Sequence, residues 1–115
     1  MRLPEEAELL RIFIGEADKH NGRPLYEVIV EEARKQGLAG ATVLRGILGF
    51  GATSLIKTNK ILRLSSDLPV VVEIVDYPEH IRSFLTLLEG MMDEGLVTLE
   101  RAKVIAYRGN RSHLD

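Results

Sequence analysis

The sequence runs twice through one order of elements: a strand, an amphipathic helix and a second strand. Apolar residues alternate over residues 7–15, recur at helical spacing over residues 24–37, and return in a strand that starts at Thr42. The same order follows in residues 70–75, 76–95 and 97–107. Alternation is typical of a half-buried strand, and spacings of three and four residues are typical of a helix. The pattern predicts the order βαββαβ, an α+β, ferredoxin-like antiparallel sheet with two helices on one face.

Local signals mark the ends of the first helix. Asn21-Gly22 predicts a turn in the polar loop before it. Pro24 suits the first turn of a helix because proline lacks the backbone N–H that is unpaired there. Gly37 predicts the C-terminal end, where a left-handed residue is common.

The ends of the second half are read in the same way. The second strand is predicted to run from Thr42 into the following glycines, with Ile47 and Leu48 among its apolar residues. Residues 76–79 (DYPE) have capping-box spacing and predict the start of the second helix. Gly95 predicts its close.

The order of elements also predicts where the connections lie. A right-handed crossover makes the first two strands parallel, with the strand at 70–75 antiparallel between them. Each helix then returns across the sheet. Three connections are therefore expected at one end of the sheet: residues 16–23, 49–68 and 91–95.

The two faces of the predicted sheet differ in what covers them. The residues expected to face the helices are Leu10, Ile12, Ile14, Val70, Val72 and Ile74. The opposite face is expected to carry Leu9, Phe13, Val71 and Val75. Arg11 and Glu73 also fall on this face, on neighbouring strands, where they can pair. An apolar patch of this kind usually marks an interface, so an oligomer is favoured over a monomer.

Composition narrows the function classes. A net charge of −2, from 15 basic and 17 acidic residues, gives no electrostatic reason to bind nucleic acid. The absence of cysteine excludes disulfides and fits a reducing cytoplasm. No window approaches the roughly 18 apolar residues of a membrane helix, and the N-terminus lacks the apolar run of a signal peptide. We expect a cytoplasmic protein without membrane insertion, forming one domain over residues 1–115.

Glycines and cations are concentrated in the stretch that joins the two halves. Gly46, Gly49 and Gly51 form G-x-x-G-x-G, which is not the dinucleotide fingerprint. They suit a bulged strand end or a backbone nest that binds phosphate, and on the residues alone the bulge is favoured. A connection of about residues 50–68 far exceeds what a hairpin needs, and such loops are usually functional or disordered. Four cations lie in or beside it: Arg45, Lys57, Lys60 and Arg63. Of these, Arg45, Lys57 and Arg63 are the ones expected to add charge at a phosphate.

The loop after the first strand is rich in polar groups. Residues 16–20 (EADKH) suit ribose hydroxyls, an ammonium group or a metal, although most such charge runs are solvated turns. The three histidines of the chain lack ligand-like spacing, so no metal site is expected. An alternative function is a small oligomeric enzyme in which Glu16 or Asp18 accepts a proton.

Five segments in combination resemble the PII-like proteins of bacteria and archaea. They are residues 15–16 (GE), 22–26 (GRPLY), 37–43 (GLAGATV), 45–51 (RGILGFG) and 64–69 (LSSDLP). The resemblance extends over residues 7–107, and its specificity lies in the combination rather than in any one segment. The proteins concerned are small relatives of PII, often encoded near fluoride-export channels.

The resemblance implies a signalling protein rather than an enzyme. It implies a homotrimer that binds an adenine nucleotide (AMP, ADP or ATP) between subunits, with or without magnesium and with no other cofactor. Residues 50–68 would be the flexible T-loop that reports occupancy to a partner, a membrane transporter or channel or an enzyme. Two features depart from familiar PII proteins. Residues 50–69 contain no tyrosine to be modified, and the turn at 90–95 (GMMDEG) contains no lysine to hold phosphate.

Loop geometry and the resemblance together give a candidate site. Backbone groups of residues 49–52 are expected near phosphate, and those of residues 95–98 near the base. The candidate nucleotide-binding residues are Glu16, Arg45, Gly46, Gly49, Phe50, Gly51, Ala52, Lys57, Arg63, Gly95, Leu96, Val97 and Thr98. No catalytic or metal-binding residue is expected.

Overall fold

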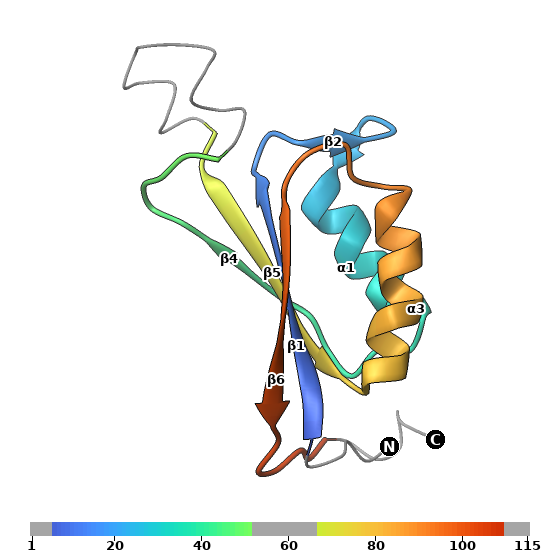
Figure 1. Cartoon of the computed structure of the whole chain (residues 1–115). Coiled ribbons are helices and arrows are strands. Elements are labelled where there is room, and N and C mark those ends of the chain that lie inside the picture. Colours follow the sequence, from blue (N-terminus) through green and yellow to red (C-terminus); the bar gives the residue numbers. More distant parts are fainter. Residues whose placement is uncertain (1–5, 52–66, 110–115) are drawn as a thin grey trace.

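The computed structural model describes residues 6–51 and 67–109. Its main sheet has the strand order β4–β5–β1–β6, formed by Thr42–Arg45, Pro69–Asp76, Glu6–Gly15 and Leu96–Lys103. Helices α1 (Leu25–Lys35) and α3 (Pro78–Glu89) cover one face of it (Figure 1). A short hairpin, β2 (Lys19–His20) and β3 (Arg23–Pro24), lies at one end. The predicted α+β, ferredoxin-like fold is confirmed.

β1 is the strand on which the sheet is built. It pairs antiparallel with β5 from Glu8 opposite Asp76 to Gly15 opposite Pro69. It also pairs antiparallel with β6 on its other side, and β4 pairs antiparallel with the outer edge of β5. β1 and β4 are therefore parallel with β5 between them, which confirms the predicted directions.

The core lies between the sheet and the two helices. Alternate residues of β1 and β5 point into it because successive strand side chains face opposite sides. The six side chains predicted to face the helices are all buried: Leu10, Ile12, Ile14, Val70, Val72 and Ile74. Ile29 from α1 and Ile81 and Phe84 from α3 fill the other side, each at most 1% exposed. Each such side chain contributes roughly 1.5–3 kcal/mol by leaving water.

The end of α1 is fixed by a Schellman motif. The N–H of Leu38 donates to the carbonyl oxygen of Ala33 at 3.1 Å, and the N–H of Gly37 donates to that of Arg34 at 3.0 Å. Gly37 has a φ of 77°, the left-handed conformation this motif requires. The predicted end at Gly37 is thus confirmed, while Pro24 is the N-cap rather than part of the first turn.

The start of α3 differs from the predicted capping box. Asp76 ends β5, Tyr77 is the N-cap without a side-chain capping bond, and Pro78 begins the helix. The buried carboxylate of Asp76 accepts hydrogen bonds from the N–H groups of Ala39 (2.7 Å) and Tyr77 (2.6 Å) and from Nδ1 of His80 (2.8 Å). The prediction was wrong because Asp76 lies one residue too early to cap the helix, and its carboxylate joins the helix start to the segment before β4.

The second strand is shorter than predicted. β4 ends at Arg45, and Ile47 and Leu48 lie beyond it with 93% and 72% of their surface exposed. The N–H of Gly46 donates to the carbonyl oxygen of Pro69 at 2.7 Å. Because Pro69 is the first residue of β5, the described part of the sheet has no further partner for residues 47–48.

The later boundaries also differ from the prediction. α3 ends at Glu89 with Gly90 as its C-cap, so Gly95 belongs to the turn before β6 and does not close the helix. β6 ends at Lys103 rather than at residue 107. Lys103 lies opposite Glu6, the first described residue of β1, so the ladder between these strands stops there.

No helix of the described residues covers the other face of the sheet, called here the open face. The predicted apolar set is half-buried on it: Leu9, Phe13, Val71 and Val75. At its centre Nε of Arg11 donates to Oε2 of Glu73 at 2.9 Å, and Nη1 donates to Glu100. These hydrogen bonds raise the pKa of the Arg11 guanidinium. The predicted pairing of Arg11 with Glu73 is confirmed.

Asp76→Ala should lower the free energy of unfolding by about 2–3 kcal/mol, because it removes the buried acceptor that three part-buried hydrogen bonds share. Urea denaturation followed by circular dichroism measures the change. His80→Ala is the matched control, since it removes a half-exposed donor and should cost less than about 1 kcal/mol. Equal losses in the two variants would contradict the role given to the Asp76 carboxylate.

Candidate functional site

Three connections meet at one end of the sheet, as predicted, within the residues that the structure describes. The N–H of Glu16 donates to the carbonyl oxygen of Leu68 at 2.8 Å, and the N–H of Ala17 donates to Oδ1 of Asp67 at 3.0 Å. The end of the long connection is therefore bound to the residues directly after β1. The β2–β3 hairpin and the turn before β6 reach the same end of the molecule (Figure 1).

A cavity of about 430 Å³ opens between these connections. It is lined by Phe13, Ile14, Gly15, Asp18, Phe50, Gly51, Asp67, Pro69, Glu94, Gly95 and Leu96. Its volume lies within the roughly 300–1,000 Å³ of small-molecule pockets. The lining combines aromatic and aliphatic surface with three carboxylates, so it offers both apolar contact and hydrogen-bond acceptors.

The hairpin after β1 places Asp18 at the cavity wall. Asn21 and Gly22 have φ values of 51° and 79°, which a two-residue hairpin turn requires, and the predicted turn is confirmed. The returning chain lets the N–H of Leu25 donate to the carbonyl oxygen of Asp18 at 2.8 Å. Oδ2 of Asp18 accepts from the N–H of Gly15 at 2.9 Å. Main chain and side chain together hold this residue in place.

Two glycines of the cavity wall lie close to neighbouring segments, and at one of them, Gly95, the backbone conformation requires glycine. Gly95 has a φ of 136°, and a Cβ there would lie 2.8 Å from the carbonyl oxygen of Phe13 and 2.5 Å from Cε of Met92. A Cβ on Gly15 would lie 2.9 Å from Oδ1 of Asp67. A larger residue at Gly95 would push the turn away from β1, whereas one at Gly15 would displace the Asp67 carboxylate from its place beside β1.

The glycines predicted to bind phosphate divide into two groups. Gly46 and Gly49 pass over Pro69, whose Cγ would lie 2.8 Å and 3.1 Å from their added Cβ atoms. The N–H of Gly46 is already bonded to Pro69, so these two glycines serve the geometry of the strand end. Gly51 and Phe50 line the cavity, and a Cβ on Gly51 would meet nothing within 4 Å.

Arg45 and Glu16, both predicted to bind nucleotide, bind each other. Nε of Arg45 donates to Oε2 of Glu16 at 3.1 Å, and Nη2 donates to the same oxygen. The Arg45 side chain is 61% exposed and that of Glu16 is 25% exposed. The cation predicted to meet phosphate thus has a carboxylate partner, and neither residue lines the cavity.

Sequence reasoning missed most of the charge in the cavity. The lining carries Asp18, Asp67 and Glu94 but no lysine or arginine among the described residues. Asp67 was overlooked because its partner Ala17 lies 50 residues away and is known only from the fold. The other predicted residues of the long connection lie outside the described residues: Ala52, Lys57 and Arg63.

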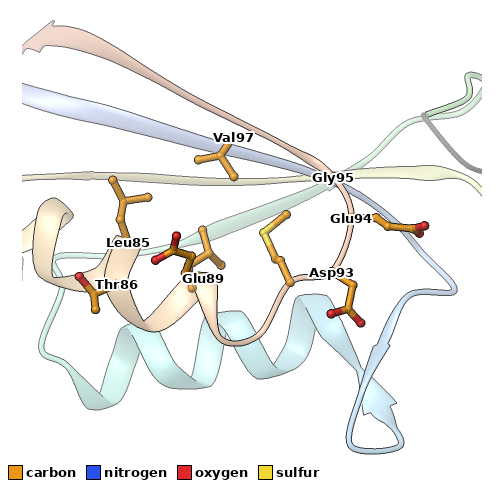
Figure 2. A pocket seen from close by; sticks show the side chains of 9 residues that line it. Leu85, Thr86, Glu89, Asp93, Glu94, Gly95 and Val97 are labelled. Atoms are coloured by element: carbon orange, nitrogen blue, oxygen red, sulfur yellow. The ribbon is translucent and has the colours of Figure 1, made fainter.

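A second groove, of about 450 Å³, lies beside the cavity between α3 and β6. Figure 2 shows Val97 of β6 over Leu85 and Glu89 of α3, with Asp93 on the turn that follows the helix. The Glu94 side chain points away from Leu85 and Glu89. This groove also contains no cation among its described lining residues, so it does not suit phosphate.

The residues predicted to contact the base are therefore divided among three surfaces. Gly95 and Leu96 reach the cavity. Val97 lines the second groove, and Thr98 lies opposite Arg11 on the neighbouring strand. Alternation along β6 separates Val97 from Leu96 and Thr98, because successive residues point to opposite faces of the sheet.

Two further findings bear on the kind of site. In residues 6–51 and 67–109, no group of three or more histidine, aspartate or glutamate side chains is arranged to hold a metal. Within the same residues, neither helix has the length and hydropathy needed to cross a bilayer.

Comparison with known sequences identifies relatives. Residues 7–104 match the family model DUF190, described as "Uncharacterized ACR, COG1993". A UPF0166 protein of Aquifex aeolicus is 47% identical over 98 residues, covering 85% of this chain and 92% of that protein. A UPF0166 protein of Methanocaldococcus jannaschii is 36% identical over 105 residues, covering 90% and 94%.

Comparison with solved structures identifies the same fold. A PII-like protein of Thermus thermophilus has a TM-score of 0.60 at 17% identity, covering 87% of this chain and 90% of that chain. CPII of Thiomonas intermedia, bound to ADP, AMP and acetate, has a TM-score of 0.57 at 17% identity, covering 90% and 92%. At such identity the likeness shows the fold, and the family match comes from sequence. The chain belongs to the DUF190 (UPF0166) family and has the PII-like fold.

Proposed function

We propose that this protein is a PII-like regulator that binds an adenine nucleotide and signals its occupancy through residues 50–68. The observation that carries the proposal is the cavity in which the end of β1, both ends of the long connection and the turn before β6 meet. Ligand bound there would contact the segments from which the connection starts and ends. The structural likeness to CPII, which was solved with ADP and AMP, supports the class of ligand.

The described lining suits the adenosine part of such a ligand. Phe50 and Leu96 expose 61% and 57% of their surface and offer apolar contact to the base. The carboxylates of Asp18 and Asp67 can accept hydrogen bonds from ribose hydroxyls or the adenine amino group. Because the described lining has no cation, the phosphates would extend toward Arg45 and the cationic residues of the long connection.

The proposal includes a homotrimer in the cytoplasm. Leu44 and Leu96 add exposed apolar surface to the open face, where strand register places them opposite Val71 and Phe13. Apolar patches of this kind usually mark an interface. A neighbouring subunit on the open face would cover this surface and add groups to the nucleotide site. The partner that reads residues 50–68 would be a membrane transporter or channel, or an enzyme.

No observation in the described residues favours the alternative of an enzyme with Glu16 or Asp18 as proton acceptor. Glu16 is paired with Arg45, and Asp18 accepts a backbone hydrogen bond from Gly15. Among the described residues the fully buried carboxylate is that of Asp76, at the other end of β5, where it accepts from three donors, and one buried oxygen of Glu8 also lies outside the cavity. The regulator is therefore the function that the geometry supports best.

Gly51→Val should abolish binding of adenine nucleotides without unfolding the protein. The new side chain would enter the cavity, while an added Cβ meets nothing of the described protein within 4 Å. Isothermal titration calorimetry with AMP, ADP and ATP, with and without magnesium, measures the affinity. Gly40→Val is the matched control, since an added Cβ there also meets nothing within 4 Å and Gly40 lies outside the cavity. A Gly51→Val variant that binds every nucleotide as tightly as the parent would refute this site.

Phe13→Glu should convert the trimer into monomers, because assembly would bury a charge without a partner. Light scattering with size-exclusion chromatography gives the mass in solution. Leu87→Glu is the control, as Leu87 is an exposed residue of α3 on the opposite side of the sheet and should leave the mass unchanged. A stable monomer for the unmodified protein would exclude the trimer.

A further inference from the structure

The proposed function directs the nucleotide phosphates toward Arg45, and the guanidinium of Arg45 is already paired with Glu16. Both Nε and Nη2 of Arg45 donate to Oε2 of Glu16. This edge of a guanidinium is one that binds carboxylate and phosphate with two parallel hydrogen bonds. The two N–H donors that a phosphate would use are therefore already bonded to Glu16, and the negative charge of that carboxylate repels the phosphate.

The pair is held by the fold more firmly on the glutamate side than on the arginine side. The Glu16 side chain is 25% exposed and the Arg45 side chain is 61% exposed, while the fold holds the backbone of both residues, Glu16 by its bond to Leu68 and Arg45 by its pairing with Val70. Arg45 can thus rotate toward a ligand at small cost, while Glu16 remains in place. A ligand can therefore take Arg45 from Glu16 without moving the Glu16 carboxylate.

The pair also lies between the two ends of the long connection. The carbonyl oxygen of Leu68 accepts the N–H of Glu16, and the carbonyl oxygen of Pro69 accepts the N–H of Gly46, the residue after Arg45. The segment that leads into the connection and the segment that leaves it therefore contact each other through Glu16 and Arg45. A ligand that replaces Glu16 at Arg45 would remove one of the contacts between these segments, and a ligand shifts a conformational equilibrium only through such a difference in contacts.

We infer that Glu16 is an internal competitor for nucleotide phosphate at Arg45, and that it sets the nucleotide concentration at which the protein responds. This inference rests on the proposed function. It assigns Glu16 a role opposite to that of a ligand-binding residue, because the carboxylate lowers the affinity for nucleotide while its partner raises it.

The variant Glu16→Gln isolates the charge. Glutamine has the same shape and its amide oxygen still accepts from Arg45, so the arginine stays oriented while the competing charge is removed. Calorimetric titration with ADP should show about two- to fivefold tighter binding than the parent, the range that a partly exposed ion pair supports. The gain should shrink as salt is raised, since screening weakens both the pair and its competition.

Three measurements control for other causes. Adenosine, which has no phosphate, should bind Glu16→Gln and the parent alike. Glu31→Gln removes the same charge from another surface pair, in which Arg23 donates to both carboxylate oxygens and lowers the pKa of Glu31, and it should leave ADP affinity unchanged. Glu16→Gln combined with Arg45→Ala should bind ADP no more tightly than Arg45→Ala alone, because the two residues act through one contact.

The outcomes separate the inference from the function on which it rests. ADP binding by Glu16→Gln that is equal to or weaker than the parent's would overturn the inference while the proposed function stands. The inference is also overturned if adenosine gains as much as ADP, or if the gain persists without Arg45. A parent protein that binds no adenine nucleotide would overturn the proposed function and the inference together.

Discussion

The antiparallel pairing of β1 with β5 is the constraint on which the rest of the structure depends. It joins eight consecutive residue pairs, from Glu8–Asp76 to Gly15–Pro69. The pairing turns alternate side chains of both strands toward the helices, so that one register fixes the core. It also places the end of β1 and the start of β5 side by side, and thereby brings Asp67 and Leu68 to the loop after β1. The cavity follows from this register, since two of its walls are the extensions of the paired strands.

The cavity walls are held mostly by backbone groups and by short acidic side chains. Asp18 and Asp67 each bind a backbone N–H of residues 15–17, and Gly95 lets the turn before β6 approach the carbonyl oxygen of Phe13. Asp18 and Asp67 therefore have a structural reason to line the cavity, because a carboxylate can accept a backbone N–H and a cation cannot. A phosphate bound in the proposed site would meet its cations outside the described lining.

The fold could be predicted from the sequence because its signals are periodic or strictly local. All six residues that alternation over residues 7–15 and 70–75 placed toward the helices are buried. Asn21-Gly22 correctly predicted the turn that joins β2 and β3. The ends of elements were predicted less well, since they depend on partners. β4 stops where β5 begins, and Asp76 caps no helix because strand pairing determines its position.

The candidate site was predicted only in part, for a related reason. Convergence of the connections follows from the order of elements, but nothing in the sequence shows that Glu16 and Arg45 bind each other across 29 residues.

The charges at the centre of the open face are paired within the subunit, which bears on the proposed trimer. Arg11 binds Glu73 and Glu100 on the two strands that flank β1, so all three side chains have partners before any assembly. The group carries a net charge of about −1, and bringing copies together on this face would be costly if every carboxylate were removed from water. Glu100 lies on the outer strand β6 and is 57% exposed, so it can remain solvated at the rim while Phe13 and Val71 are covered. In the proposed trimer, a neighbour could thus cover the apolar part of the open face while the Glu100 carboxylate stays in water.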